Sequence, residues 1–182
     1  YCAGGAGVHV GIAGSAIGVN YQLYRGGVPV GSPVAGIGAG FSFGLQTVAG
    51  NYTVTASNAT APCTLFLPGS VNVIVYSLPT DFTVTGGGTY CPGGTGVTIG
   101  LSGSQTGVTY RLYRGATPVG ASISGTGAAI SFGLQTVAGT YTVIATMSGF
   151  TACTATMTGS AVVALYSLPT AYTITGGGSY CP

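Results

Sequence analysis

The chain has 182 residues and is rich in Gly and Tyr, but it carries only three Lys or Arg residues and one Asp or Glu residue. Charged residues normally make up about a quarter of a soluble domain, so a content of 2% means that charge does not keep this surface in solution. We therefore expect sugars or neighbouring molecules to cover it. Apolar runs are short and interrupted by Gly, Thr and Ser, so no segment reaches the roughly 20 residues of a transmembrane helix.

Few side chains can titrate, which argues against enzymatic chemistry. General acid and base catalysis needs titratable groups beside the substrate, and hard metal ions need several carboxylates. The chain offers one His and one carboxylate, that of Asp81. Its net charge of +2 is also too small for a phosphate-binding patch. We expect no enzyme, no metal or other cofactor, and no nucleic-acid partner.

An internal repeat sets the domain organisation. Residues 90–141 repeat residues 1–52, and SLPTAYTITGGGSYCP at 167–182 repeats SLPTDFTVTGGGTYCP at 77–92. Repeats this similar are usually copies in a longer array, so we interpret the chain as a stretch of a periodic protein. The predicted domains are residues 1–80, a first repeat without its first strand; residues 81–170, a complete second repeat; and residues 171–182, the first strand of a third repeat.

Short strands separated by turn residues predict an all-β fold. In the second repeat the apolar alternation and the turn signals predict seven strands, at 81–85, 97–101, 108–113, 119–123, 128–132, 140–146 and 154–166. Gly159 and Ser160 interrupt the last of these and predict a bulge where the strand bends between sheets. Seven strands in about 90 residues is the size of an immunoglobulin-like β-sandwich, so we predict tandem immunoglobulin-like β-sandwich domains.

Two tyrosines support this assignment. Tyr141 follows the turn residue Gly139 at the start of the sixth predicted strand, and Tyr52 occupies the same position in the first repeat. This arrangement is typical of a tyrosine corner, in which the phenol hydroxyl bonds to the backbone a few residues upstream. The usual cysteine two residues after that tyrosine is absent, because Val143 and Val54 stand there.

The five cysteines predict one disulfide in each repeat. Their spacing favours the pairs Cys2 with Cys63 and Cys91 with Cys153, while Cys181 would find its partner in a further repeat. Two alternatives stay open: buried free thiols, or bridges between neighbouring repeats through Cys63 and Cys91. Disulfides indicate an oxidising, extracellular compartment.

The strings SLPTxxTxTGGGxYC, GVxYxLYRG and SFGLQTVAGxYTV resemble the tandem immunoglobulin-like repeats of very long secreted surface proteins of gliding and biofilm-forming Bacteroidota. That group includes giant adhesins exported by the type IX secretion route. The resemblance covers the whole chain. It implies a stalk or filament on the extracellular side of the cell surface, with no enzymatic activity.

The LYRG motif supplies candidate contacts between subunits. It places Tyr24 and Arg25, and in the second repeat Tyr113 and Arg114, at the end of the third predicted strand. One interpretation is a regular ladder of guanidinium groups that contact surface glycans or the backbone of a neighbouring copy. The other is an arginine whose aliphatic stem packs on its own domain while the charge reaches water.

Sheet edges are normally protected by Lys or other charges, and these are scarce here. We therefore hypothesise a structural repeat of an extracellular filament that associates with copies of itself end to end and laterally. Two alternatives are a spacer stalk of a giant adhesin that does not self-associate, and an ice- or carbohydrate-binding module built on alternating threonines such as Thr53 and Thr55. Residues 171–182 raise a further alternative, in which this strand completes the sandwich of another subunit.

Overall fold

The structure is a computed structural model that describes residues 1–61 and 63–181. Those residues form strands and connecting segments, which confirms the all-β prediction. The chain divides into two compact units, unit 1 from Tyr1 to Leu78 and unit 2 from Pro79 to Pro182. The boundary lies close to the predicted one between 80 and 81. The predicted third part, residues 171–182, groups with unit 2, and Pro182 lies outside the described residues.

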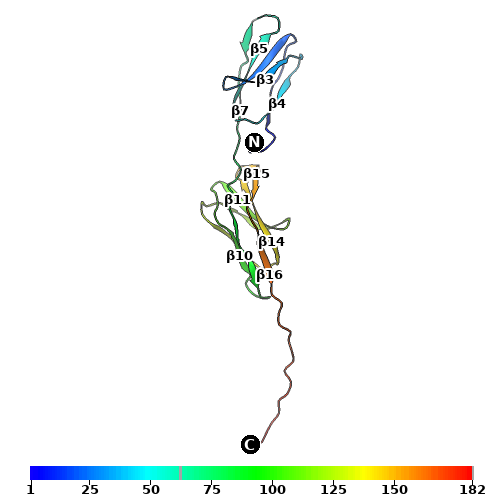
Figure 1. Cartoon of the computed structure of the whole chain (residues 1–182), viewed down its shortest axis with the longest axis vertical. Coiled ribbons are helices and arrows are strands. Elements are labelled where there is room, and N and C mark those ends of the chain that lie inside the picture. Colours follow the sequence, from blue (N-terminus) through cyan, green and yellow to red (C-terminus); the bar gives the residue numbers. More distant parts are fainter. Residues whose placement is uncertain (62, 182) are drawn as a thin grey trace. The chain divides into compact units, whose positions relative to one another are not determined.

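Unit 2 is a sandwich of two β-sheets (Figure 1). The first sheet has the order β13-β10-β8, with strands β13 (Ile130–Gln135), β10 (Val97–Leu101) and β8 (Val84–Gly86). The second has the order β12-β11-β14-β16-β9, with strands β12 (Thr117–Ser124), β11 (Val108–Arg114), β14 (Gly139–Met147), β16 (Ala161–Leu165) and β9 (Gly88–Tyr90), and β15 (Phe150–Thr156) pairs with β14 as well.

This strand order is that of an immunoglobulin-like domain. Strands A, B and E form one sheet and strands C, C′, F and G form the other, with a short first-strand segment beside G. The pairs are antiparallel except that β9 runs parallel to β16. The immunoglobulin-like prediction is therefore confirmed.

A run of three glycines divides the first strand between the two sheets. The predicted strand at 81–85 overlaps β8 in one sheet, whereas β9 in the other sheet lies beyond the predicted strand. Gly86 and Gly87, between them, have φ angles of 88° and 83°. A Cβ at Gly86 would lie 2.0 Å from the Thr98 carbonyl oxygen, and one at Gly87 would lie 2.7 Å from that of Val162. Only glycine allows this crossing, because other residues would be strained and would clash with backbone.

The last strand is divided near the predicted bulge at Gly159, but the predicted bend from one sheet to the other is wrong. Its halves β15 and β16 both pair with β14. Between them, Thr158 leaves that sheet and forms an isolated parallel bridge with Thr83, just before β8 of the opposite sheet. The break at Gly159 therefore links the two sheets on this side of the sandwich.

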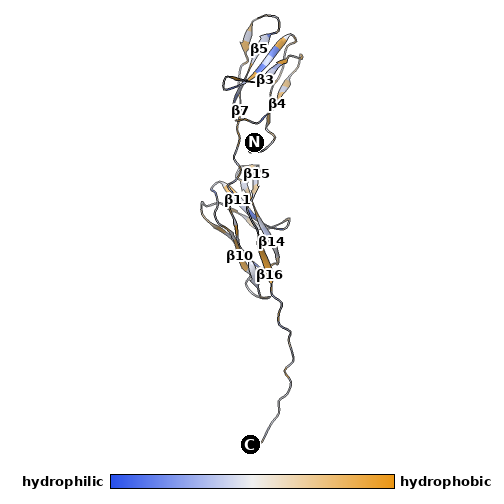
Figure 2. Ribbon diagram, in the orientation of Figure 1, coloured by the Kyte–Doolittle hydropathy of each residue, from blue (hydrophilic) through white to orange (hydrophobic). Residues whose placement is uncertain are grey.

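The core of unit 2 lies between the sheets. Alternate residues of each strand point inward, as the period of two requires, and β10 and β16 stand out as hydrophobic (Figure 2). Fully buried side chains are those of Ile99, Leu101, Val108, Tyr110, Leu112, Tyr141, Val143, Met157 and Val163. They come from both sheets, so burying this shared surface is what holds the sheets together.

Unit 1 has the same architecture without the first strand. One sheet pairs β1 (Val8–Ile12) with β4 (Phe41–Gln46). The other contains β3 (Val28–Ala35), β2 (Val19–Arg25), β5 (Gly50–Asn58), β6 (Thr64–Phe66) and β7 (Val71–Val73). Among the described residues, no strand of unit 1 corresponds to β8. One side of β1 therefore has no neighbouring strand in this unit.

Both repeats contain the hydrogen bond of a tyrosine corner. The Tyr141 hydroxyl donates to the Val137 carbonyl oxygen at 2.7 Å, and the Tyr52 hydroxyl donates to that of Val48 at 2.8 Å. Both tyrosines are almost fully buried. The bond ties the turn before β14 or β5 to the strand itself and satisfies a carbonyl at the edge of the core.

This geometry predicts that Tyr141→Phe destabilises unit 2 by about 1–2 kcal/mol, because the Val137 carbonyl loses its donor while the packing of the ring is kept. Tyr52→Phe should have a similar effect on unit 1. Chemical denaturation of the full chain measures both. Tyr166→Phe serves as a control because that side chain is largely exposed, and it should change stability little. A Tyr141→Phe effect no larger than that of the control would contradict the role of the corner.

Candidate functional site

Metal-binding and membrane-spanning features do not point to a site. Within residues 1–61 and 63–181, no group of three or more His, Cys, Asp or Glu side chains is arranged to hold a metal ion. In the same part of the chain, no helix is long and apolar enough to cross a membrane. His9 Nδ1 lies 3.1 Å from Ser42 Oγ on the surface of unit 1. The candidate sites are therefore a groove, the cysteines and the apolar surface.

The groove lies along the open side of β1 in unit 1. Its volume is about 480 Å³. One wall is the segment from Val10 to Gly14, and the others come from β5 and from the residues between β6 and β7. The lining residues include Val10, Ile12, Tyr52, Val54, Leu67 and Val71. The groove is thus mostly apolar and is bordered by a free strand edge.

Strand β8 occupies the same place in unit 2. It pairs with β10, with Leu101 opposite Val84 and Ile99 opposite Gly86. By the internal repeat, Leu101 and Ile99 correspond to Ile12 and Val10, which line the groove. The groove of unit 1 therefore lies where unit 2 has its first strand.

Side-chain exposure agrees with this interpretation. Val71 in the groove is 45% exposed, whereas its counterpart in unit 2, Ala161, is 2% exposed beneath the first-strand segment. The Ala161 methyl lies close to the position that a Cβ on Gly87 would take, so the crossing from β8 to β9 covers it. Unit 1 leaves uncovered an apolar surface that unit 2 buries.

Residues 171–177 have the sequence of a first strand but no partner strand. They repeat residues 81–87, and all of them are exposed. Tyr172 is 87% exposed and Ile174 is 97% exposed, whereas Val84, the counterpart of Ile174, is only 7% exposed in unit 2. Within the described residues, the first-strand position of unit 1 is thus open, and residues 171–177 pair with no strand.

Asp81 anchors the first strand of unit 2, a role that its sequence did not predict. Its Oδ1 accepts a hydrogen bond from the Thr158 N–H at 2.8 Å, and its Oδ2 accepts one from the Thr158 hydroxyl. Both bonds lower the pKa of Asp81 below its ordinary value, and the bond from the Thr158 hydroxyl has the larger effect. The other repeats lack the residues of this anchor. Ala171 stands at the position of Asp81, and Pro68 stands at the position of Thr158.

The cysteines differ from the prediction. Cys2 and Cys153 are disulfide-bonded, whereas Cys63, Cys91 and Cys181 are exposed free thiols. The predicted pairs Cys2 with Cys63 and Cys91 with Cys153 are therefore wrong, and so is the alternative bridge between Cys63 and Cys91. A partner for Cys181 in a further repeat stays a prediction.

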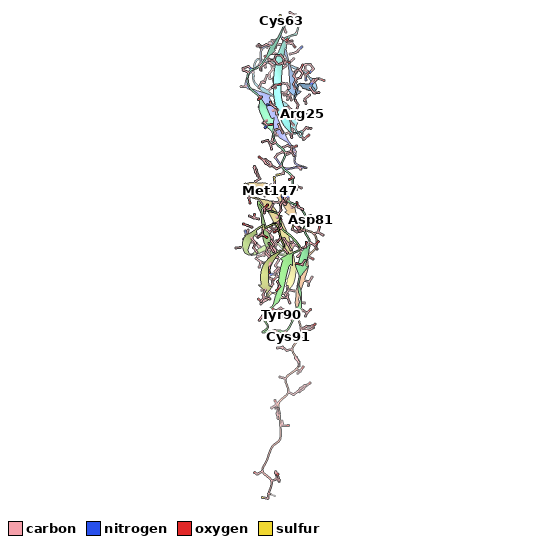
Figure 3. The ribbon with its side chains drawn as sticks, turned by 90° about the vertical axis from the view of Figure 1, so that its left-hand side faces the viewer. Arg25, Cys63, Asp81, Tyr90, Cys91 and Met147 are labelled. Carbon is pink, nitrogen blue, oxygen red and sulfur yellow. The ribbon has the colours of Figure 1, made fainter. Side chains whose placement is uncertain are left out.

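The fold explains why a repeat cannot pair its own cysteines. Cys91 follows β9, whose Tyr90 pairs with Leu165 beyond the Gly139 end of β14. Cys153 lies on β15 beside the opposite end of β14, since the neighbouring Thr154 pairs with Thr146. Figure 3 shows Cys91 and Met147 at opposite ends of unit 2.

The length of β14 separates these two ends by about 27 Å, at roughly 3.4 Å per residue. A disulfide requires Cα atoms within about 7 Å. Unit 1 repeats the pattern. The backbone of Cys2 forms an isolated β-bridge with Tyr76 near one end of β5. At the other end, the Cys63 carbonyl accepts a hydrogen bond from the Asn58 N–H. Each repeat thus carries one cysteine at each end.

The LYRG arginines pack on their own domains. An ideal Cβ on Gly50 would lie 2.9 Å from Arg25 Cγ, and one on Gly139 would lie 2.9 Å from Arg114 Cδ. The aliphatic stems therefore lie over the glycines that begin β5 and β14. Tyr24 and Tyr113, on the same strands, are half-buried. This geometry accounts for the repeated arginine without a partner molecule.

The alternating threonines do not all face solvent. Thr83 and Thr85 are exposed, but Thr55 is buried and Thr53 is half-buried. A binding face that matches a regular lattice needs both threonines of a pair at the surface of each repeat. The Thr53 and Thr55 pair therefore gives no support to an ice-binding surface.

An apolar patch recurs at the same place in both repeats. In unit 1 it consists of Leu45 and Val48, and in unit 2 of Leu134 and Val137, each about half exposed. We call each pair the E–F patch of its unit. In each unit the pair lies just before the tyrosine of the tyrosine corner. In both repeats the two residues lie in the string LQTVAG, for which the sequence analysis predicted no exposed patch.

Comparison with known proteins gives a likeness to solved structures but no family. No protein-family model matches the chain, and no curated protein matches it. Among solved structures, the human OSCAR ligand-binding domain is similar at 17% sequence identity and a TM-score of 0.38, over 86% of this chain and 90% of that one. The immunoglobulin-like assignment rests on the strand order of the chain itself.

The Asp81 anchor predicts acid sensitivity. A lowered pKa in the folded state means that the anchor stabilises unit 2 above the unfolded pKa of about 3.9 and that this contribution is lost as the pH falls through the folded pKa. Thermal unfolding of unit 2 should therefore shift to lower temperature between about pH 4 and pH 2. Asp81→Asn should remove most of this pH dependence, because the sequence contains no other acidic side chain. An unchanged pH profile in Asp81→Asn would refute the anchor.

The cysteine assignment predicts a definite labelling pattern. Iodoacetamide without a reductant should alkylate Cys63, Cys91 and Cys181, because their thiols are free and exposed. Cys2 and Cys153 should react only after reduction and unfolding, since they are disulfide-bonded. Peptide mass spectrometry reads the label at each site. Labelling of Cys2 before reduction would contradict the structure.

Proposed function

We propose that this chain is a structural segment of an extracellular fibre, in which repeats join end to end and copies associate laterally through uncharged surfaces. Its place at a bacterial cell surface, with export by a type IX route, follows from the resemblance of its repeat strings and belongs to the proposal. The disulfide is compatible with an oxidising, extracellular setting.

The observation that carries the proposal is the E–F patch. It exposes two apolar side chains at the same place in each repeat, on a protein with only 2% charged residues. Exposed apolar surface is a feature of many interaction sites. Because the patch recurs with the repeat, a second array can meet it in register, and each further repeat adds another identical contact.

The edge strands favour lateral contacts made by side chains over lateral contacts made by strand pairing. Edge strand β3 contains Pro29 and Pro33, and its counterpart β12 contains Pro118. Proline has no N–H to donate, so it blocks the addition of a neighbouring strand. The scarcity of charge predicts unprotected edges, but proline protects these two strands instead. The E–F patch is therefore the better lateral surface.

The cysteine positions support end-to-end linkage. A cysteine at the end of a repeat is too far from the other end to close a bond within that repeat, so any disulfide it forms reaches outside it. Cys63 and Cys91 are equivalent by repeat to Cys153 and Cys2, which are disulfide-bonded. We infer that in a longer array these free thiols have partners in other repeats.

Lateral association can be tested on the full chain, made without sugars and with its free thiols alkylated. Ile174→Asp is included to keep the exposed segment 171–177 from contributing. We expect this chain to associate as its concentration rises, measured by sedimentation velocity. Adding Leu45→Lys and Leu134→Lys should make it monomeric, because each lysine places a charge in the E–F patch.

The matched control adds two lysines at Ala59 and Ser148, which are exposed and equivalent by repeat. It gives the same net charge but should leave association intact. A chain with Ile174→Asp that stays monomeric at high concentration would overturn the lateral contact. The non-associating spacer stalk would then be the better description.

A further inference from the structure

We propose that His9 makes lateral association through the E–F patch of unit 1 sensitive to pH, so that copies associate at neutral pH and separate when the imidazole is protonated. This inference rests on the proposed function, because it names a regulation of the same patch. It also predicts that the two repeats differ, since unit 2 has Thr98 at the position of His9.

A β-bulge turns the leucine of the patch outward. In unit 1, His9 pairs with Leu45, and the next pair along the ladder is Gly11 with Ser42. Two residues of β4 therefore lie opposite one residue of β1, and one of the two is Gly44, with a φ angle of 87°. Regular alternation along β4 would turn Leu45 into the core, but the extra residue turns it to the surface.

Unit 2 contains the same bulge. Thr98 pairs with Leu134, the ladder shifts after this pair, and Gly133 has a φ angle of 75°. Thr98 and Leu134 are both exposed. Each repeat therefore presents its leucine on the outer face of the sheet, directly opposite the residue that differs between the repeats.

His9 lies beside Leu45 on that outer face. Residues that pair across antiparallel strands point to the same side of the sheet, with Cβ atoms about 4.5–5.5 Å apart. His9 is exposed, and Leu45 is 48% exposed. A second copy that covers Leu45 therefore also removes the imidazole from water.

Ser42 links the imidazole to the bulge. Its Oγ lies 3.1 Å from His9 Nδ1 and accepts a hydrogen bond from the Gly44 N–H at 3.0 Å. A serine hydroxyl can donate to a neutral imidazole nitrogen and accept from a protonated one. The ring can therefore stay in place in both states, and protonation adds its charge beside the patch.

The strands beside His9 bring no charged side chain to it. Strand β4 has none along its whole length. The segment before β1 contributes the Tyr1 phenol, a neutral group whose hydroxyl donates to the Thr47 carbonyl. On the other side of β1 the repeat predicts a glycine, because the first strand of unit 2 brings Gly87 to the Thr98 carbonyl. Unit 1 contains no Asp or Glu, so a protonated imidazole meets no acidic side chain there.

A second copy offers no free acidic side chain either. The sequence contains one, that of Asp81, and in unit 2 both of its oxygens accept hydrogen bonds from Thr158. Removing an unpaired charge from water costs far more than removing a neutral polar group. Association therefore favours the neutral imidazole. Histidine ordinarily changes its charge between pH 5 and 8, so association should weaken as the pH falls through this range.

Sedimentation velocity at about pH 8 and about pH 5.5, on either side of the ordinary titration of histidine, tests this inference. The parent chain carries Ile174→Asp and alkylated thiols, as in the test of the lateral contact. Its dissociation constant should be at least about tenfold higher at the lower pH. The lowered pKa of Asp81 keeps that carboxylate ionised at both pH values, and the thiols are blocked, so His9 is the side chain whose charge changes.

The repeat supplies matched variants. His9→Thr gives unit 1 the residue that unit 2 has, and it should associate equally at both pH values while keeping the α-amino group of the parent. Thr98→His makes the opposite exchange and should increase the pH dependence, because both patches then carry an imidazole. Adding Ala59→His to His9→Thr restores one imidazole at an exposed position beyond the opposite end of β5, and it should restore no pH dependence.

Equal association of the parent at both pH values would overturn the inference and leave the lateral contact intact. A pH dependence that survives in His9→Thr, or that returns with Ala59→His, would do the same. A parent that is monomeric at both pH values would overturn the lateral contact and this inference with it. The tyrosine circular dichroism of the parent should be the same at both pH values, and its loss at the lower pH would assign the change to unfolding and refute the role of His9.

Discussion

The first strand closes the sandwich in this protein, and most of its other features depend on that closure. In unit 2, β8 covers Leu101 and neighbouring core residues on one sheet, while the segment that follows crosses to the other sheet and covers Ala161. Three consecutive glycines make the crossing possible, because two of them take backbone angles and close approaches that side chains would forbid. Without the strand, unit 1 has an apolar groove where unit 2 has a core.

Because the surface carries few charges, closing the sandwich matters for how much apolar surface stays exposed. A domain with lysines and glutamates on its surface can tolerate a small exposed apolar groove, because charge keeps it apart from its neighbours. This chain has almost no such protection, and its outer strands rely on prolines instead. The E–F patch recurs with the repeat and is exposed in both units, and it is the surface that we propose for contacts between copies.

Mechanical continuity would come from the ends of the repeats. The two cysteines of a repeat lie at opposite ends of a long central strand, so their disulfides cannot staple a domain internally. The Asp81 anchor acts at a similar point, where the first strand meets the break in the last one.

Local sequence patterns are enough to predict the fold class, the repeat and the location of most strands, whereas contacts across the sandwich depend on the folded chain. Strand alternation has a short period and depends on neighbouring residues, so β10 and the tyrosine corner could be predicted from Val97 to Leu101 and from the Gly139 turn. Spacing along the chain favoured Cys2 with Cys63, but the distance between them is set by the direction of β5, which the cysteine count does not contain. For the same reason the role of Asp81 becomes visible only when the fold brings Thr158, distant in sequence, beside it. The groove was hidden as well, because an empty strand position is a relation between two sheets that a linear pattern does not record.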